Sequence, residues 1–227
     1  MKDKSNISNK LFAEFRNYFK DEIDRSFQVK TYKKGEFIYT KGETPQGVYF
    51  MKYGWVKIFR DGKGTEEVIL HILGHNEFIG YIPLLKETKY NNYAQALEYS
   101  ELYFIPKNIF LSLLRENVDF AQLIIQMLCN EIWSNEEQIV SLHSKRIDSR
   151  LATLLLGLEQ ASDNNTVHND SLIRIPKKDL ARIINISPET LSRYLNKFQK
   201  SGLLKSVNGM IGLLKKDKLY QMSKMDD

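Results

Sequence analysis

One stretch decides the fold of this chain: Asp179-Leu180-Ala181-Arg182-Ile183-Ile184-Asn185-Ile186-Ser187-Pro188-Glu189-Thr190-Leu191-Ser192-Arg193. Three apolar residues at helical spacing, Leu180, Ile183 and Ile184, predict a first short helix. Asn185 stands where the chain must turn, and Asn tolerates a left-handed backbone better than any residue except Gly. Ser187 then offers a favourable N-cap for a second helix. The stretch therefore predicts a helix-turn-helix.

The second helix should present polar side chains from its first turn. Pro188 suits the first helical position, because its φ is fixed and it lacks an N–H that would find no acceptor there. The apolar face of this helix should consist of Leu191, Tyr194, Leu195 and Phe198. The residues left to face outward are Glu189, Thr190, Ser192, Arg193 and Asn196. A carboxylate, hydroxyls and a guanidinium in the first two turns of a helix can read base edges in the major groove of DNA.

The positive charge of the chain lies around this motif. From Lys145 onward there are 15 lysines and arginines against 9 acidic residues, a net charge of +6, whereas the residues before Lys145 carry a net charge of −1. Phosphate backbones attract such a surplus. Farther along, Asn208-Gly209 separates two short apolar runs, which is the pattern of a tight β-hairpin. A hairpin directly after a recognition helix is a wing, so residues 146–227 should form a winged helix-turn-helix domain.

Short runs of β-branched and aromatic residues fill residues 26–106. Four of these runs are 37–39, 48–51, 55–59 and 68–73, and turns that contain glycine stand between them. The regular spacing predicts an all-β jelly-roll. We expect residues 1–108 to form this domain, together with an N-terminal helix.

Helical periodicity replaces this pattern after Pro106, and no Pro or Gly interrupts residues 107–156. A single helix of that length could not be covered by one face of a small barrel, so a break is expected near Glu116-Asn117. The long helix within residues 109–145 needs a partner for its apolar seam. A second copy of the same helix would supply one and would make a parallel, coiled-coil-like homodimer. The fold class is therefore α+β: a β-jelly-roll, a long dimerisation helix and a winged helix-turn-helix.

Composition narrows the class of protein. The single cysteine, Cys129, excludes an intrachain disulfide, and the residues after Met1 lack the apolar core of a signal peptide, so a cytoplasmic protein is expected. We expect Cys129 to be buried as a small apolar residue, and a redox switch or a bridge at a dimer axis are the alternatives. His71 should be a sheet residue and His75 a turn residue. On a continuous strand they would lie about 13 Å apart, too far to share a metal ion. No metal site, no cofactor and no catalytic activity is expected.

The order of β-roll, long helix and winged helix resembles the Crp/Fnr family, to which the cyclic-AMP receptor protein belongs. In the first domain the matching motifs are Lys34-Gly35-Glu36-Phe37-Ile38, Lys41-Gly42-Glu43, Tyr53-Gly54-Trp55-Val56-Lys57-Ile58 and Gly74-His75-Asn76-Glu77-Phe78-Ile79-Gly80. In the second they are Arg150-Leu151-Ala152, Asp179-Leu180-Ala181, Glu189-Thr190-Leu191-Ser192-Arg193 and Ser201-Gly202-Leu203-Leu204. The resemblance covers nearly the whole chain. It implies a homodimeric transcription regulator that binds a near-palindromic operator in double-stranded DNA, often under the control of a small-molecule effector, with RNA polymerase as a further partner.

The resemblance assigns the reading of bases to Glu189 and Arg193. An arginine can donate two bonds to guanine O6 and N7, and a glutamate can accept one from cytosine N4. Otherwise the two residues would be an ordinary exposed ion pair on a helix. Pro188 stands where other members place a third polar reader, so the preference at that base stays open. Four residues are expected to hold phosphates: Ser187, Thr190, Lys197 and Lys205.

The expected effector site departs from that of the members that bind cyclic AMP. Those members follow the Phe-x-Gly motif with a Glu and, about ten residues later, an Arg for the cyclic phosphate. Here Tyr81 follows Gly80, and no arginine occurs between Arg60 and Arg115. A buried phosphate without a bidentate partner would be costly, so cyclic AMP is not the expected ligand. An iron–sulfur cluster, which needs about four cysteines, is not expected either.

An effector pocket between roll and long helix could instead be lined by other residues. The candidates are Tyr81, Tyr90, Asn91, Asn92, Tyr93 and Trp133. The aromatic residues among them could equally be packing residues of a β-rich core, and the effector itself stays unknown.

Two further functions stay open from the sequence. A ligand-independent regulator would use its β-roll only as a scaffold. A cupin-like enzyme with an accessory winged helix would need a clustered site of histidines and carboxylates, which 4 scattered histidines do not predict.

Overall fold

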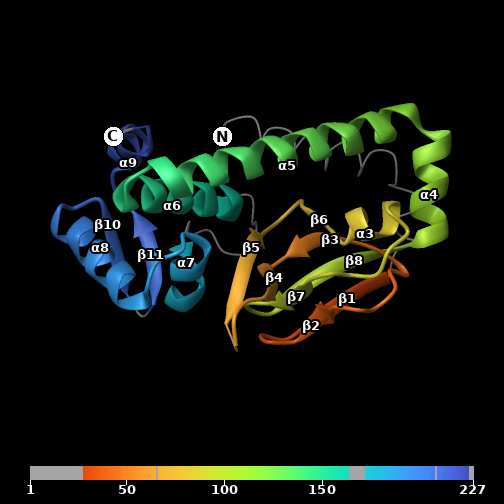
Figure 1. Cartoon of the computed structure of the whole chain (residues 1–227), viewed down its shortest axis with the longest axis horizontal. Helices are drawn as coiled ribbons and strands as arrows, with labels where there is room; N and C mark the ends of the chain where they lie inside the picture. Colours follow the sequence, from red (N-terminus) through yellow and green to blue (C-terminus); the bar gives the residue numbers. More distant parts are fainter. Residues whose placement is uncertain (1–27, 65, 164–171, 208, 225–227) are drawn as a thin grey trace.

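The computed structural model describes residues 28–64, 66–163, 172–207 and 209–224 of the chain. A β-roll, connecting helices and a C-terminal winged helix follow one another along the sequence (Figure 1). This is the predicted α+β order. The expected N-terminal helix and the turn residue Asn208 fall outside the described residues.

The β-roll consists of two antiparallel four-stranded sheets. The first has the order β1 (Gln28–Tyr32), β8 (Ser100–Pro106), β3 (Gly47–Tyr53) and β6 (Phe78–Ile79). The second has the order β2 (Phe37–Tyr39), β7 (Tyr93–Ala96), β4 (Val56–Asp61) and β5 (Glu67–Leu73). Neighbouring strands come from distant parts of the sequence, as the pairs Val48↔Ile105 and Ile58↔Ala94 show. This crossing between sheets is the predicted jelly-roll arrangement.

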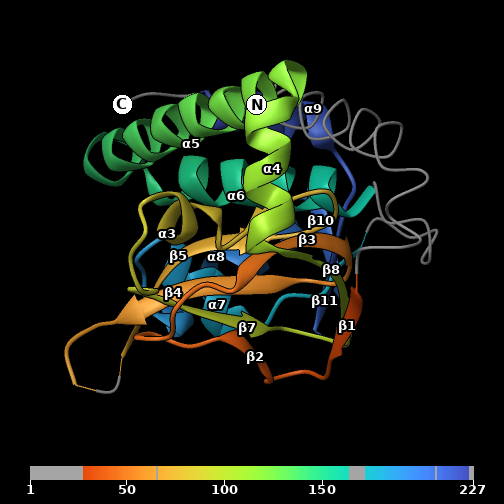
Figure 2. The same ribbon diagram turned by 90° about the vertical axis from the view of Figure 1, so that its right-hand side faces the viewer.

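Three helices follow or interrupt the strands of the roll. The short α3 (Tyr81–Leu85) lies between β6 and β7, and α4 (Lys107–Glu116) leaves β8 at the end of the roll. Helix α5 (Val118–Ser144) has 27 residues, so it is about 40 Å long at 1.5 Å per residue. It runs over the roll from α4 to the winged helix (Figures 1 and 2). No helix in the described part of the chain is both long and apolar enough to span a membrane.

The predicted break in the helical region is confirmed at Asn117. Its backbone is extended, with φ −122° and ψ 102°, and its side chain accepts a hydrogen bond from the backbone N–H of Phe120 at 2.9 Å. An Asn in this position caps the first turn of α5 and so favours a new helix over continuation of the old one. The cap sets the direction in which α5 leaves the roll.

Strand β3 is buried on both faces because it lies between the interior of the roll and the helices. Tyr49 and Met51 belong to the cluster inside the roll. Val48 and Phe50 alternate with them and belong to the cluster that includes Phe110 of α4. Full burial of a side chain of this size contributes roughly 1.5–3 kcal/mol. This face therefore anchors α4 and the start of α5.

The winged helix completes the chain. Its elements are α6 (Ile147–Asp163), β9 (Leu172–Ile173), α7 (Lys177–Ile183), α8 (Pro188–Lys200), β10 (Leu204–Val207), β11 (Met210–Leu213) and α9 (Lys216–Ser223). The strands form one antiparallel sheet in the order β10-β11-β9. The fully buried residues Leu155 of α6, Leu180 of α7 and Phe198 of α8 share its core. The predicted hairpin is present, with Val207 opposite Met210.

The expectation that Cys129 is buried is wrong for the single chain, because Cys129 is exposed on α5. It lies four residues after Ile125 and three before Ile132, so it shares their side of the helix. Both of these isoleucines are themselves more than half exposed. This side of α5 faces away from the roll.

Candidate nucleic-acid interface

The turn between α7 and α8 has the geometry that the sequence predicts. Asn185 adopts a left-handed backbone with φ 53°. Ser187 caps α8 by accepting a hydrogen bond on Oγ from the backbone N–H of Thr190 at 3.2 Å, and Pro188 occupies the first helical position. The cap and the proline fix where α8 begins, and so they fix which side chains its first turn presents.

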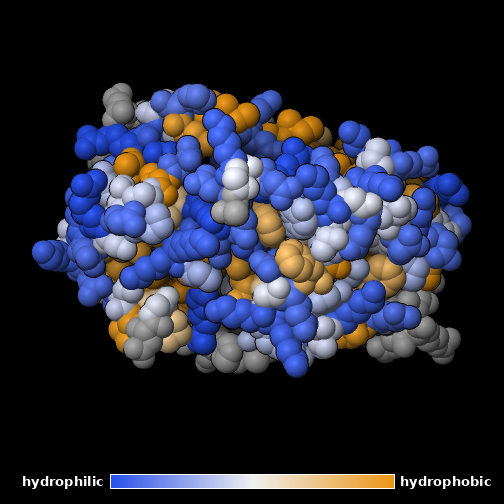
Figure 3. Space-filling view, turned by 60° about the horizontal axis from the view of Figure 1, so that its bottom comes forward, coloured by the Kyte–Doolittle hydropathy of each residue, from blue (hydrophilic) through white to orange (hydrophobic). Residues whose placement is uncertain are grey.

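Helix α8 separates its buried and exposed residues as predicted. Leu191, Leu195 and Phe198 are buried in the winged-helix core. On the outer side, a shallow open depression is lined by Glu189, Ser192, Arg193, Asn196, Lys197, Lys200 and Ser201. The surface seen from the lower side of the molecule is mostly hydrophilic, with apolar residues only in small separate groups (Figure 3).

The two predicted base readers lie one helical turn apart and are both exposed. The pKa of the Glu189 carboxyl is lowered by hydrogen bonds from its own backbone N–H and from the Ser187 side chain. Glu189 therefore stays ionised well below neutral pH and keeps its capacity to accept hydrogen bonds. Arg193 lies with its guanidinium carbon 5.7 Å from the ring centre of Tyr194. Neither residue forms an ion pair within the described parts of the chain, which argues against an ordinary surface pair.

The four predicted phosphate ligands differ in their exposure and in whether another side chain already binds them. Ser187 and Thr190 lie at the start of α8, where their hydroxyl oxygens are 3.2 Å apart. Lys205 is exposed on β10, the first strand of the wing. Lys197, however, donates to Asp148 of α6 at 3.3 Å, so it would have to leave this carboxylate to reach a phosphate.

Lys200 lies in the same depression as Arg193, although it was not among the residues predicted from the sequence. It is exposed at the last position of α8. The signal was present in the sequence, because Lys200 follows Arg193 by seven residues, two helical turns, and therefore falls on the same side of the helix.

A second candidate site is a cavity of 790 Å³ among β5, α3, α5 and the α7–α8 turn. Three of the six predicted effector residues, Tyr81, Asn91 and Asn92, line it. The Oδ1 atom of Asn92 is buried and has no hydrogen-bond partner among the described residues. Glu131 of α5 also lines the cavity and accepts a hydrogen bond from the Tyr81 hydroxyl. Burial and this carboxylate both raise the pKa of Tyr81.

The other three predicted effector residues do not line this cavity, and their role at an effector site stays a prediction. Tyr90 is buried and stacks on Tyr39 with ring centres 3.7 Å apart. Tyr93 stacks on Phe59, with ring centres 5.1 Å apart. Trp133 is 69% exposed on α5. Aromatic residues between a sheet and a helix can either pack in the core or line a pocket. Their spacing in the sequence does not distinguish these two roles.

Cations that the sequence analysis did not single out also line the cavity. They are Arg60, Lys86, Lys89 and Arg182. The first three form no ion pair with another described residue. The two carboxylates of the lining are already engaged: Glu77 accepts from the backbone N–H of Gly74 at 2.7 Å, and Glu131 from Tyr81. The cavity therefore has an excess of available positive charge.

The two histidines of the roll lie as expected, His71 in β5 and His75 in the turn after it. His75 is held by its Nδ1 atom, 2.7 Å from the carbonyl oxygen of Lys52. Within the ranges that the structure describes, no three His, Cys, Asp or Glu side chains form a group that could hold a metal ion.

Comparison with known proteins gives matches over both parts of the chain. Residues 29–117 match the family model of the cyclic nucleotide-binding domain, and residues 149–222 match that of the Crp-like helix-turn-helix domain. Electron transport regulator A of Shewanella oneidensis is 29% identical over 188 residues, which are 81% of this chain and 74% of the relative. The fumarate and nitrate reduction regulatory protein of Vibrio cholerae is 26% identical over 207 residues, 89% of this chain and 82% of the relative.

A solved structure shows the same fold. FixK2 from Bradyrhizobium japonicum superimposes with a TM-score of 0.75 at 19% sequence identity, over 88% of this chain and 98% of that chain. The order of β-roll, long helix and winged helix is therefore shared along most of both chains.

Proposed function

This chain belongs to the Crp/Fnr family of transcription regulators, and on that premise we propose that two copies of it read the halves of an inverted-repeat operator through Glu189 and Arg193. The observation that carries the proposal is the exposed polar side of α8, which presents an ionised carboxylate and a guanidinium one turn apart. In the major groove Arg193 would donate to guanine O6 and N7, and Glu189 would accept from cytosine N4. These contacts select a sequence.

Contacts to phosphates would position α8 without selecting a sequence. The candidates are Ser187 and Thr190 at the start of α8 and Lys205 on the first strand of the wing. Lys200 joins them at the end of α8. Lys197 would contribute after it leaves Asp148. Because such contacts release counterions, binding should weaken steeply as salt concentration rises.

The homodimer would form along α5. Four exposed apolar residues, Val118, Ile125, Ile132 and Ile139, recur at intervals of seven residues and are each 58–69% exposed. A seven-residue repeat of branched apolar residues is the pattern of a coiled coil. Paired in parallel, two α5 helices would cover this strip and bring two copies of α8 to successive major grooves, about 34 Å apart.

The effector of this regulator would be a small anionic molecule in the cavity between β5, α3 and α5. Arg60, Lys86 and Lys89, which form no ion pair with another described residue, favour a negative ligand. Cyclic AMP is a poor candidate, because the roll beside Gly80 is filled by Tyr90, which stacks on Tyr39. The alternative is a regulator that needs no ligand. A thermal-shift panel of anionic metabolites separates the two, since a ligand at 100 times its Kd adds about 2.7 kcal/mol of stability.

A role as an enzyme is disfavoured by the relatives, which are transcription regulators. We therefore propose a protein without catalytic activity, in preference to a cupin-like enzyme with an accessory winged helix. A regulator must share a compartment with its operator, which places its action in the cytoplasm. RNA polymerase would be its partner at the promoter.

The proposed function is tested by selecting bound fragments from random and genomic DNA with the purified protein. An inverted repeat with a G·C pair in each half-site, read one helical turn apart, is the expected product. Enrichment no better than that of shuffled competitor DNA would refute sequence-specific binding. Sedimentation of the enriched complex gives its stoichiometry, for which two chains per operator are expected.

A further inference from the structure

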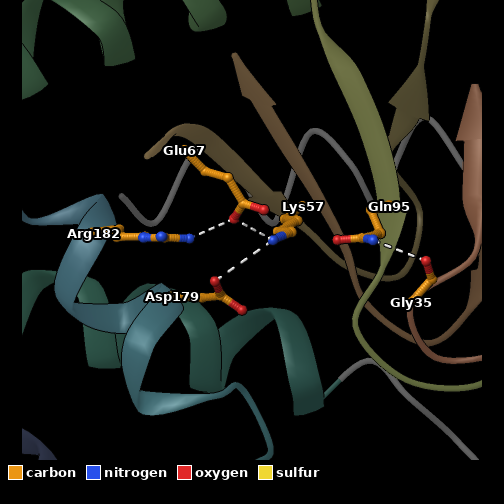
Figure 4. Close-up of polar contacts among 6 residues, drawn as sticks. All are labelled: Gly35, Lys57, Glu67, Gln95, Asp179 and Arg182. Atoms are coloured by element: carbon orange, nitrogen blue, oxygen red, sulfur yellow. Dashed lines mark hydrogen bonds and ion pairs between the residues drawn. The ribbon is translucent and has the colours of Figure 1, made fainter. Parts of the chain in front are cut away.

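The winged helix contacts the β-roll through a network of four charged side chains, in which each is within ion-pair distance of the next (Figure 4). Lys57 of β4 and Glu67 of β5 come from the roll, and Asp179 and Arg182 come from α7. Their charges alternate in sign along the connections of this network, in the order Arg182, Glu67, Lys57, Asp179. Two residues of each sign balance the charge of the group.

The distances show a connected network. The Glu67 Oε2 atom accepts from Lys57 Nζ at 2.6 Å and from Arg182 at 2.5 Å. Lys57 Nζ also lies 3.7 Å from an Asp179 carboxylate oxygen. Lys57 is therefore the group through which a carboxylate of the roll and a carboxylate of the helix-turn-helix are held together.

The network lies in a place where an unpaired charge would be costly. The side chains of Lys57 and Asp179 are only 7% and 8% exposed. Burial raises the pKa of Asp179, and the nearby Lys57 opposes this rise. The loss of one partner in such a setting leaves the other buried without compensation. A change at Lys57 should therefore loosen the contact between the domains.

Apolar side chains also pack between the roll and the winged helix, beside the charged network. Trp55 and Leu97 of the roll are buried in the same cluster as Leu180 of α7 and Leu191 of α8. Helices α7 and α8 thus share a core with each other and touch the roll on one side. The contacts that hold α7 against β4 and β5 therefore also set the orientation of α8.

We propose that Lys57 is a positioning residue for DNA recognition: by joining Glu67 to Asp179 it holds α7 on the roll and so sets the orientation of α8. The proposal rests on the proposed function for its consequence in DNA binding, but the contact itself does not depend on it. The cavity described above has β5 on one side and Arg182 on the other. A ligand there would touch both sides of the same contact.

The first test measures the distance between the domains in the full-length protein. Spin labels are placed at Lys34 on the roll and Lys218 on α9 in a Cys129→Ser background, and labelled chains are diluted with unlabelled ones. Double electron–electron resonance on the protein with Lys57 intact should give one narrow distribution of distances between the two labels. Lys57→Met should broaden or shift it, whereas Lys57→Arg, which keeps the charge, should restore it.

Lys52→Met is the matched control for this test. Lys52 also pairs with a carboxylate, Glu101 at 2.9 Å, but both residues belong to the roll. This variant should leave the distribution unchanged. Arg182→Gln removes a more exposed member of the network. It replaces Lys57→Met in the measurement if that variant does not fold. A distribution for both Lys57→Met and Arg182→Gln that matches the unsubstituted protein would overturn the proposal.

The second test measures how the protein tolerates a change of spacing between the half-sites of its selected operator. The unsubstituted protein should lose affinity when one base pair is inserted at the centre. Lys57→Met should reduce that discrimination by a factor on the order of 3 to 30, the range of coupling between sites. Unchanged discrimination despite a broadened distance would refute the positioning role in DNA binding. If no operator is found, the proposed function fails, while the distance measurement still decides whether Lys57 holds the contact.

Discussion

Arg193 is the residue on which sequence-specific binding should depend most. Arg193 is exposed and forms no ion pair with a described residue, so its guanidinium is available to a base edge. We expect Arg193→Ala to weaken binding to the selected operator by about 1–3 kcal/mol and to leave binding to random DNA nearly unchanged. Fluorescence anisotropy on both DNAs at one salt concentration measures the difference.

Arg115→Ala is the control for this prediction, because Arg115 is an exposed arginine on α4. It should change neither affinity. Equal weakening of both DNAs by Arg193→Ala would instead make Arg193 a phosphate ligand.

Asn185 is a second residue with a clear physical requirement. Its φ of 53° lies in the left-handed region, which costs a β-branched residue roughly 1–2 kcal/mol. Asn185→Val should lower the free energy of unfolding by about that amount, whereas Asn185→Gly should be tolerated. Urea denaturation compares them with Asn196→Val, on the exposed side of α8, where only the smaller helix propensity of Val counts. Equal losses for the two valine variants would contradict this explanation.

The residue scale also shows what a sequence cannot decide. The prediction for the helix-turn-helix was accurate at Asn185, Ser187 and Pro188 because each is constrained by its own backbone. Cys129, which was expected to be buried, is exposed in the single chain, and Trp133 does not line the cavity, because the surroundings of both depend on which side of α5 faces the roll. That choice is made by tertiary packing, which local spacing does not encode.

At the scale of elements, the N-cap of α8 is the feature most easily tested. Ser187 accepts from the backbone N–H of Thr190, so Ser187→Ala leaves that donor without its partner. We expect a loss of about 0.5–2 kcal/mol in the free energy of unfolding. Ser192→Ala, inside the same helix, should cost little. If the two alanine variants unfold at the same denaturant concentration, the cap does not stabilise the helix.

Elements with a clear local signal were predictable from the sequence. The break at Asn117, the strands β2 to β5 and the wing hairpin follow from caps, turns and alternation. The strands β1, β7 and β8 were not named individually, and the short helix α3, the terminal helix α9 and the two-residue strands β6 and β9 were missed. The missed elements are short, and long-range contacts stabilise them.

At the scale of the whole molecule, the exposed strip on α5 predicts a dimer. Ile132→Glu places a charge in the middle of this strip, so it should convert the protein to a monomer and weaken binding to an inverted repeat. Analytical ultracentrifugation measures the first effect. Val29→Glu changes an exposed valine of β1 in the same way and should leave a dimer. A dimeric Ile132→Glu protein would show that the two chains associate elsewhere.

In the proposed complex, α8 lies in the major groove with Arg193 on a guanine. Methylation interference on the selected operator probes this contact, because a methyl group on N7 blocks the bond that Arg193 would make. We predict that methylation of one guanine in each half-site interferes with binding through Arg193. Arg193→Ala should abolish the interference at this guanine and leave any interference at other guanines unchanged. The absence of any guanine interference that depends on Arg193 would contradict the claim.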